Sequence, residues 1–287
     1  DREHLKNISL EIRDTLEKRR QDLDLTFIEE QHIYYMKDLD GKIKKNFPSV
    51  SKIVKKFYKP FDANGMSLKM TNGDEEAAKL LQEQWKKAAD MSTNMGSRIH
   101  FELETDTISR YGNYKEDRQP IFDINEEQRI KSDNMILAGK NYLDLMEERG
   151  AVLLDTEIVL GDPEEQYTGQ PDKAWLMYNK EKTDIGVVIT DWKSNQPKNF
   201  EVQHYTGKMF DPFQGYHDTA LTHYYIQLPL YARLLKKMLS TSKFKDLKFF
   251  GGVVVLLKDD GSYQEYRVPS DVINKVFNLD LRNYIRR

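Results

Sequence analysis

The chain has 287 residues, with 44 Lys and Arg against 47 Asp and Glu, and no cysteine. The lack of cysteine excludes disulfides, zinc ribbons, thiol nucleophiles and cysteine-bound iron–sulfur clusters. The longest aliphatic run, residues 253–257, is far shorter than the ~20 residues needed to cross a bilayer. We therefore expect an intracellular protein of a reducing compartment, the cytoplasm (including that of an infected host) or the mitochondrial matrix, without membrane contact. The formal charge of −3 requires any polyanionic partner to be held by a local basic surface.

Residues 1–71 are expected to form an N-terminal extension. Apolar residues at helical spacing predict a helix within residues 1–24, and alternation predicts short strands within 25–47. Lysines and aromatic residues then alternate in a short helical segment. Such a segment fits either a surface that follows phosphates and stacks on bases or a solvated helix face above a buried aromatic stripe. The candidate nucleic-acid contacts in this segment are Lys52, Lys55, Lys56 and Tyr58.

Residues 72–287 are expected to form the main domain. Three helices are predicted before residue 150, over about 74–91, 96–110 and 125–149. The period then changes to two, which predicts strands, and a helix, a hairpin and a closing helix follow. These later elements are expected at 151–160, 167–178, 185–192, 219–239, 249–268 and 270–285. The order predicts an α/β fold with a mixed central sheet flanked by helices.

Two of the predicted strands carry carboxylates at positions suited to chemistry. The apolar strand after residue 185 ends in Asp191 and Lys193, which alternation places on one face. Asp172 follows a glycine and a proline at a turn or strand entry, and antiparallel neighbours would bring it to Asp191. Two carboxylates held together usually bind a hard divalent cation such as Mg²⁺ or Mn²⁺. An Asp-x-Lys tripeptide alone indicates little, since it occurs three times here; its position after a buried strand and the single Pro-Asp dipeptide distinguish this copy.

Two helical pairs are separate candidates for the same site. His100 and Glu104 are four residues apart, so they share a helix face and can offer a nitrogen and an oxygen to one metal ion. The alternative is an ordinary surface pair. Gln227 and Tyr231 are also one turn apart and can face the site together.

Taken in order, these motifs resemble those of RecB-like nucleases in the PD-(D/E)XK superfamily. The matching motifs are His100 in Gly-Ser-x-x-His, Asp172 in Gly-x-Pro-Asp, Asp191-Trp192-Lys193, and Gln227-x-x-x-Tyr231. The resemblance covers roughly residues 27–235, and segment 47–53 is similar to phage members and mitochondrial exonucleases. Because the chain has no cysteine, it is similar to the cluster-free branch of the family.

The resemblance implies a role for each matching residue. It implies one or two Mg²⁺ or Mn²⁺ ions bound by His100, Asp172, Asp191 and the carbonyl of Trp192. Lys193 would orient the attacking water or offset negative charge in the transition state. The remaining roles implied are the positioning of Lys193 and the strand by Gln227 and Tyr231, and support from Glu104 and Glu157.

Together with the resemblance, these features predict metal-dependent hydrolysis of DNA from single-stranded ends, in DNA repair or recombination and in a phage context. The alternatives are a structure-selective endonuclease and an inactive nucleic-acid-binding module on the same fold. The long helical region 73–150 is expected to pack beside the active site and to restrict entry to an unpaired end.

Overall fold

The fold is built around a five-stranded mixed sheet with the strand order β10-β9-β8-β7-β4. In the computed structural model, residues 1–112, 120–201 and 207–285 are described. Strands β8 and β9 run parallel, and the other neighbours are antiparallel, so the predicted mixed α/β architecture is confirmed. The strands are β4 (Val152–Thr156), β7 (Lys173–Tyr178), β8 (Ile185–Lys193), β9 (Lys248–Leu257) and β10 (Tyr263–Arg267).

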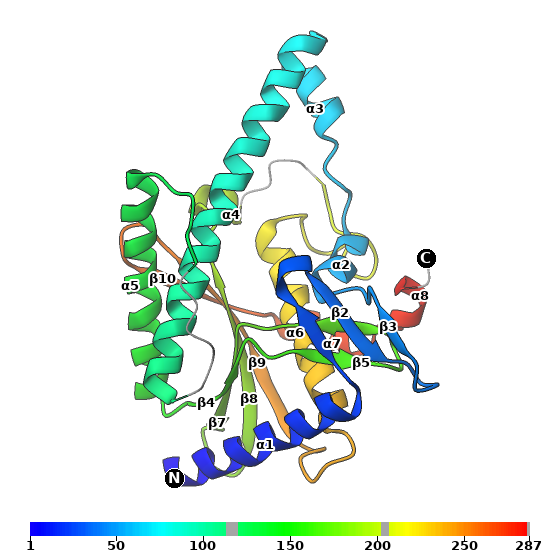
Figure 1. Ribbon diagram of the computed structural model, residues 1–287, viewed down its shortest axis with the longest axis vertical. Coiled ribbons are helices and arrows are strands. Elements are labelled where there is room, and N and C mark those ends of the chain that lie inside the picture. The colour runs from blue at the N-terminus through cyan, green and yellow to red at the C-terminus, as the bar shows by residue number, and fades with distance from the viewer. Residues whose placement is uncertain (113–119, 202–206, 286–287) are drawn as a thin grey trace.

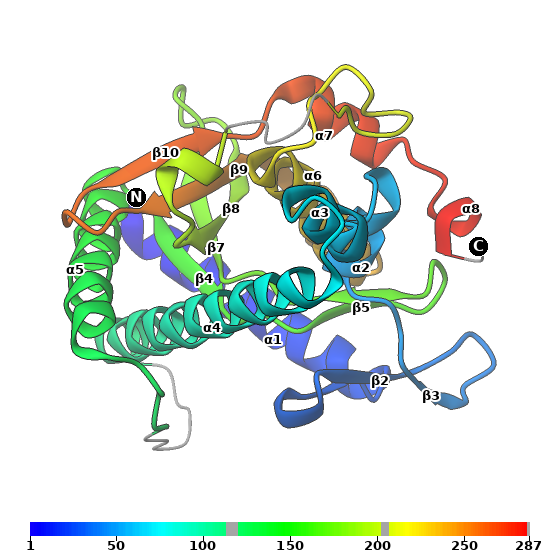
Figure 2. The ribbon, with the colours of Figure 1, turned by 90° about the horizontal axis from the view of Figure 1, so that it is seen from above.

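Helices cover both faces of this sheet (Figures 1 and 2). On one face lie α4 (Glu75–Tyr111) and α5 (Glu126–Glu148), and on the other lie α1 (Arg2–Asp22) and α6 (Ala220–Leu239). Alternation along β8 divides its side chains between the two layers. Ile189 packs in the cluster with α1 and α6, and Trp192 packs in the cluster with α4 and α5.

The N-terminal residues share the core of the rest of the chain. Leu5, Ile12 and Leu16 of α1 are buried in one cluster with the sheet residues Leu154 and Ala174. The predicted short strands form a separate three-stranded antiparallel sheet, β1-β2-β3. Its elements and those that follow are β1 (Thr26–Ile28), η1 (Glu29–Gln31), β2 (Ile33–Lys37), β3 (Ile43–Lys45), α2 (Val50–Val54) and η2 (Lys55–Phe57).

The structure differs from the sequence prediction most clearly at α4. The two helices predicted over 74–91 and 96–110 are one helix of 37 residues, capped by Asp74 and ended by Gly112 in the left-handed conformation. It contains no proline, and Gly96 alone does not break a helix that is held at both ends. A short helix, α3 (Ala63–Met70), precedes it and was not predicted. Figure 1 shows α3 and the first part of α4 projecting beyond the sheet.

Several other predicted elements are divided in two. Residues 151–160 turn out of β4 at Glu157, which has a positive φ of 48°, and β5 (Leu160–Asp162) follows. Pro171 separates β6 (Tyr167–Gly169) from β7, and β6 pairs with β5. The closing segment forms α7 (Ser270–Phe277) and α8 (Leu281–Ile285). A short η3 (Pro197–Asn199) follows β8.

Candidate metal centre

Asp172 and Asp191 meet at one end of the central sheet, as predicted. Lys173 of β7 pairs with Thr190 of β8, so antiparallel register places the preceding Asp172 beside the following Asp191. The amide of Asp172 donates to Asp191 Oδ1 at 3.2 Å, and the amide of Trp192 donates to Asp172 Oδ2 at 2.7 Å. Both carboxyl groups are therefore buried and held by the backbone of the neighbouring strand.

Lys193 is ion-paired within the same strand end. Its Nζ lies 2.8 Å from Asp191 Oδ2 and 4.2 Å from the centre of the Tyr224 ring on α6. Burial by itself lowers the pKa of this ammonium, but the carboxylate of Asp191 outweighs burial and raises the pKa above its ordinary value. Lys193 is therefore a fixed positive charge beside the two aspartates.

Glu157 is brought to the site by an unusual backbone turn. It follows β4 in a left-handed conformation that costs a residue other than glycine about 1 kcal/mol or more. Its amide donates to the carbonyl oxygen of Asp172 at 2.8 Å, and that oxygen also accepts from Thr156 Oγ1 at 3.1 Å. These bonds stabilise the turn and carry Glu157 to the side of Asp172. The supporting role expected for Glu157 thus understates its position.

His100 reaches the cluster from α4. The helix lies close to α5 at Gly139, where an added Cβ would lie 2.5 Å from Leu103. Arg98 fixes the same turn by donating to Ser132 Oγ at 2.5 Å and to Asp133 Oδ1 at 2.6 Å. His100 Nδ1 then lies 3.2 Å from Asp172 Oδ1.

These residues form a set that could hold a metal ion. One ligand atom each from His100, Glu157 and Asp172 lies within 4.8 Å of the others. Asp191 was expected among the ligands but is not in this set; its two oxygens accept from Lys193 and the Asp172 amide. One imidazole nitrogen and two carboxylate oxygens suit a divalent cation. The carbonyl of Trp192 as a ligand stays a prediction.

The buried charged groups of the cluster shift one another's pKa values. Burial and the neighbouring Asp172 raise the pKa of Glu157 to about 8, and they raise the pKa of Asp191 to about 6. Burial opposes ionisation of Asp172 as well, but His100 and Lys193 hold its pKa below the ordinary range. Burial likewise opposes a charge on His100, but Asp172 raises its pKa to about 9. Near neutral pH, protons on Glu157 and His100 therefore offset part of the negative charge of the buried carboxylates.

Lys173 is a residue of this region that the sequence motifs do not include. It is fully buried, and its Nζ lies 3.4 Å from Thr156 Oγ1 and 5.3 Å from the centre of the Trp192 ring. Burial lowers its pKa, whereas the carboxylates of Asp172 and Glu157 oppose this effect. The sequence did contain a signal for this residue, which is a lysine within an otherwise apolar strand. A buried lysine needs a compensating charge, so its position indicates that carboxylates lie nearby.

Of the two predicted residues on α6, Tyr231 lies beside the aspartates. Tyr231 is buried against the Gly169 backbone, where an added Cβ would lie 2.8 Å from its ring. Burial and the charges of Asp191 and Asp172 raise the pKa of its hydroxyl, which therefore stays protonated. The Gln227 side-chain oxygen is buried without a hydrogen-bond partner among the described residues. Pro229 lies inside the uninterrupted α6.

The remaining candidates are not part of the set formed by His100, Glu157 and Asp172. Glu104 is one turn beyond His100 and contributes charge to Glu157 and Lys173. Lys52, Lys55 and Lys56 are exposed on α2 and η2. The Tyr58 ring stacks on His223 of α6 at 3.8 Å between ring centres, so one of its faces is covered.

Comparisons with known proteins do not identify the site. No model of a known protein family matches the chain, and no curated protein matches it. In the part of the chain that the structure describes, no helix has both the length and the apolar character that a membrane crossing requires.

Proposed function

We propose that this protein is a Mg²⁺- or Mn²⁺-dependent DNA nuclease of the RecB-like group in the PD-(D/E)XK superfamily, acting on single-stranded ends. The observation that carries the proposal is the convergence of His100, Glu157 and Asp172 beside the Asp191–Lys193 pair. All five side chains meet at one end of a mixed sheet, and four of them belong to the ordered motifs that the family shares.

Each residue has a task in phosphodiester hydrolysis. His100, Asp172 and Glu157 would hold the cation, which would lower the pKa of water and offset charge on phosphate oxygens. Asp191 fixes Lys193, whose ammonium stabilises negative charge that develops on the phosphate. The Asp172 carboxylate keeps its orientation through the amide of Trp192.

The position of the basic segment of α2 and η2 supports a role in binding the substrate strand. Ser49, which caps α2, forms a β-bridge with Thr168 of β6, four residues before Asp172. Lys52, Lys55 and Lys56 therefore project from an element that adjoins the turn leading to the metal centre. Exposed ammonium groups at such a position can neutralise backbone phosphates.

The test is digestion of a single-stranded DNA that carries a label at either end, with Mg²⁺ or with EDTA. We expect hydrolysis with Mg²⁺ and none with EDTA, and a Lys193→Ala variant should be slower by about 10²-fold. Lys180, an exposed lysine in the turn between β7 and β8, supplies the control Lys180→Ala. Wild-type protein that leaves the strand intact under both conditions would refute a nuclease.

A circular single strand of the same sequence distinguishes an exonuclease from an endonuclease. An exonuclease digests the linear strand and leaves the circle intact. Equal cleavage of the two substrates would contradict the requirement for an end and would instead identify an endonuclease.

A further inference from the structure

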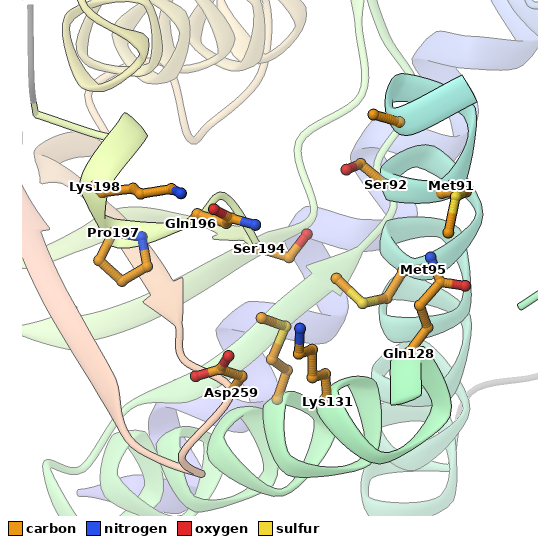
Figure 3. A pocket seen from close by; sticks show the side chains of 12 residues that line it. Met91, Ser92, Met95, Gln128, Lys131, Ser194, Gln196, Pro197, Lys198 and Asp259 are labelled. Atoms are coloured by element: carbon orange, nitrogen blue, oxygen red, sulfur yellow. The ribbon is translucent and has the colours of Figure 1, made fainter. Parts of the chain in front are cut away.

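A cleft opens beside the segment that directly follows β8. It lies between the part of α4 where the helix leaves the body, the start of α5, and the segment that follows β8 (Figure 3). Its volume is about 630 Å³, within the ~300–1,000 Å³ that small-molecule sites occupy.

The lining of the cleft combines an apolar wall with polar groups. Met91, Met95 and Met135 form the apolar part, and Gln196 and Lys198 face it from the segment after β8. Methionine is a flexible thioether that packs favourably against aromatic rings. Gln196 can both donate and accept hydrogen bonds, as the edge of a nucleobase requires.

The charge at the rim is suited to an anion on the Lys198 side. Lys198 is exposed and forms no ion pair with the described residues. On the opposite rim, Lys131 is paired with Glu127 at 2.7 Å, and Asp259 lies nearby. A phosphate would therefore lie beside Lys198, with the apolar wall left for a base.

The cleft adjoins the metal centre through two residues. Ser194 lines the cleft and directly follows Lys193 in the chain, whereas Met95 lies just over one helical turn before His100. Between them α4 passes close to the segment, since an added Cβ on Gly96 would lie 3.5 Å from Ser194 Oγ. A strand bound at the metal centre would have its next nucleotide within reach of this cleft.

We propose that the cleft is a nucleotide subsite, which takes the unpaired base next to the scissile phosphate between Met91 and Gln196 and the adjoining phosphate at Lys198. This inference rests on the proposed nuclease function and adds the place and chemistry of substrate binding. An unpaired strand is the substrate that can turn a base into the cleft, because a duplex keeps its bases stacked and paired.

The experiment measures binding of a fluorescent single-stranded 12-mer and of a series in which one nucleotide at a time lacks its base. Ca²⁺ replaces Mg²⁺ during binding, and hydrolysis with Mg²⁺ is measured separately. For wild-type protein, we expect one position near the bound end at which loss of the base weakens binding about fivefold. In Met91→Ala, the intact strand should bind about fivefold more weakly and the position should lose its effect.

Matched control variants test whether weaker binding comes from misfolding or from a general loss of positive charge. Met70, exposed on α3, supplies Met70→Ala, and Lys180→Ala is compared with Lys198→Ala. Both controls should bind as wild type, and thermal melting should show that all variants fold. The subsite is refuted if no missing base affects binding, or if the effect persists in Met91→Ala, while wild type still cleaves. Absence of cleavage by wild-type protein would instead refute the nuclease proposal itself.

Discussion

The two halves of α4 form one continuous helix in very different surroundings. In the second half, Ile99 and Leu103 are fully buried against α5 and the sheet. In the first half, Ala78 is buried, and from residue 79 to residue 98 no side chain of this described stretch is fully buried. Leu80 is 61% exposed there.

Under the proposed function, this difference would let the helix serve both chemistry and binding. The packed half holds His100 in place, because a ligand must be positioned by side chains that are themselves locked. The projecting half has few tertiary contacts and offers Met91 and Met95 to the cleft at its base. If this division is correct, changes in the packed half should affect catalysis and stability, and changes at exposed positions of the projecting half should not affect stability.

The largest effect is expected from Asp172→Asn in the centre that the packed half supports. The change keeps the shape of the side chain but removes the charge that holds His100 and the proposed cation. The hydrolysis rate at saturating Mg²⁺ should fall about 10²- to 10³-fold. Asp90→Asn, on the exposed face of the projecting half, should match wild type. Equal activity of Asp172→Asn and Asp90→Asn would show that hydrolysis does not depend on the proposed metal centre.

A comparison of Ile99→Ala with Leu80→Ala tests the two halves directly. Removing the buried Ile99 side chain should lower the free energy of unfolding by about 2–4 kcal/mol. Removing the exposed Leu80 side chain should change it by less than about 0.5 kcal/mol. Urea denaturation measures both values. A large loss for Leu80→Ala would show that the projecting half packs against something in solution.

The charge cluster predicts that stability without metal falls as the pH rises. His100 has a folded pKa of about 9 against 6.5, and Glu157 has about 8 against 4.5. Each folded group binds a proton that the unfolded chain releases, so its stabilising contribution is complete below the unfolded pKa and is lost as the pH rises through the folded pKa.

The window in which both groups act together is therefore about pH 6.5 to 8. In EDTA, the melting temperature should fall by roughly 4 °C across this window, and Glu157→Gln should show a smaller fall. Mg²⁺ should oppose the loss in wild type, since a ligand of the folded state stabilises it. A melting temperature that rises with pH in EDTA would contradict the charge assignment.

The sequence predicted the parts of the site that local periodicity controls. Alternation placed Asp191 and Lys193 together, and the meeting of Asp172 with Asp191 followed from antiparallel pairing of adjacent strands. Glu157 could not be placed in the same way, because its position depends on a positive φ that β-strand periodicity does not encode. The sequence pattern also failed to predict that α4 is one continuous helix. Its polar middle is helical because the two ends of the helix are packed, and the local sequence pattern does not record that packing.

The smallest effect is expected from removal of exposed positive charges. This experiment tests which surface binds the substrate strand. Replacing Lys52, Lys55 and Lys56 by alanine should weaken binding of a single strand about tenfold. The slope of log binding constant against log salt concentration should become smaller in magnitude by about 2, since each phosphate contact releases a counterion. The matched control replaces three exposed lysines of the projecting half: Lys79, Lys86 and Lys87. Fluorescence titration at several salt concentrations gives both slopes. If the control variant loses as much affinity, the projecting half of α4 also binds the strand along its length, and the cleft at its base would then be only one part of a longer track.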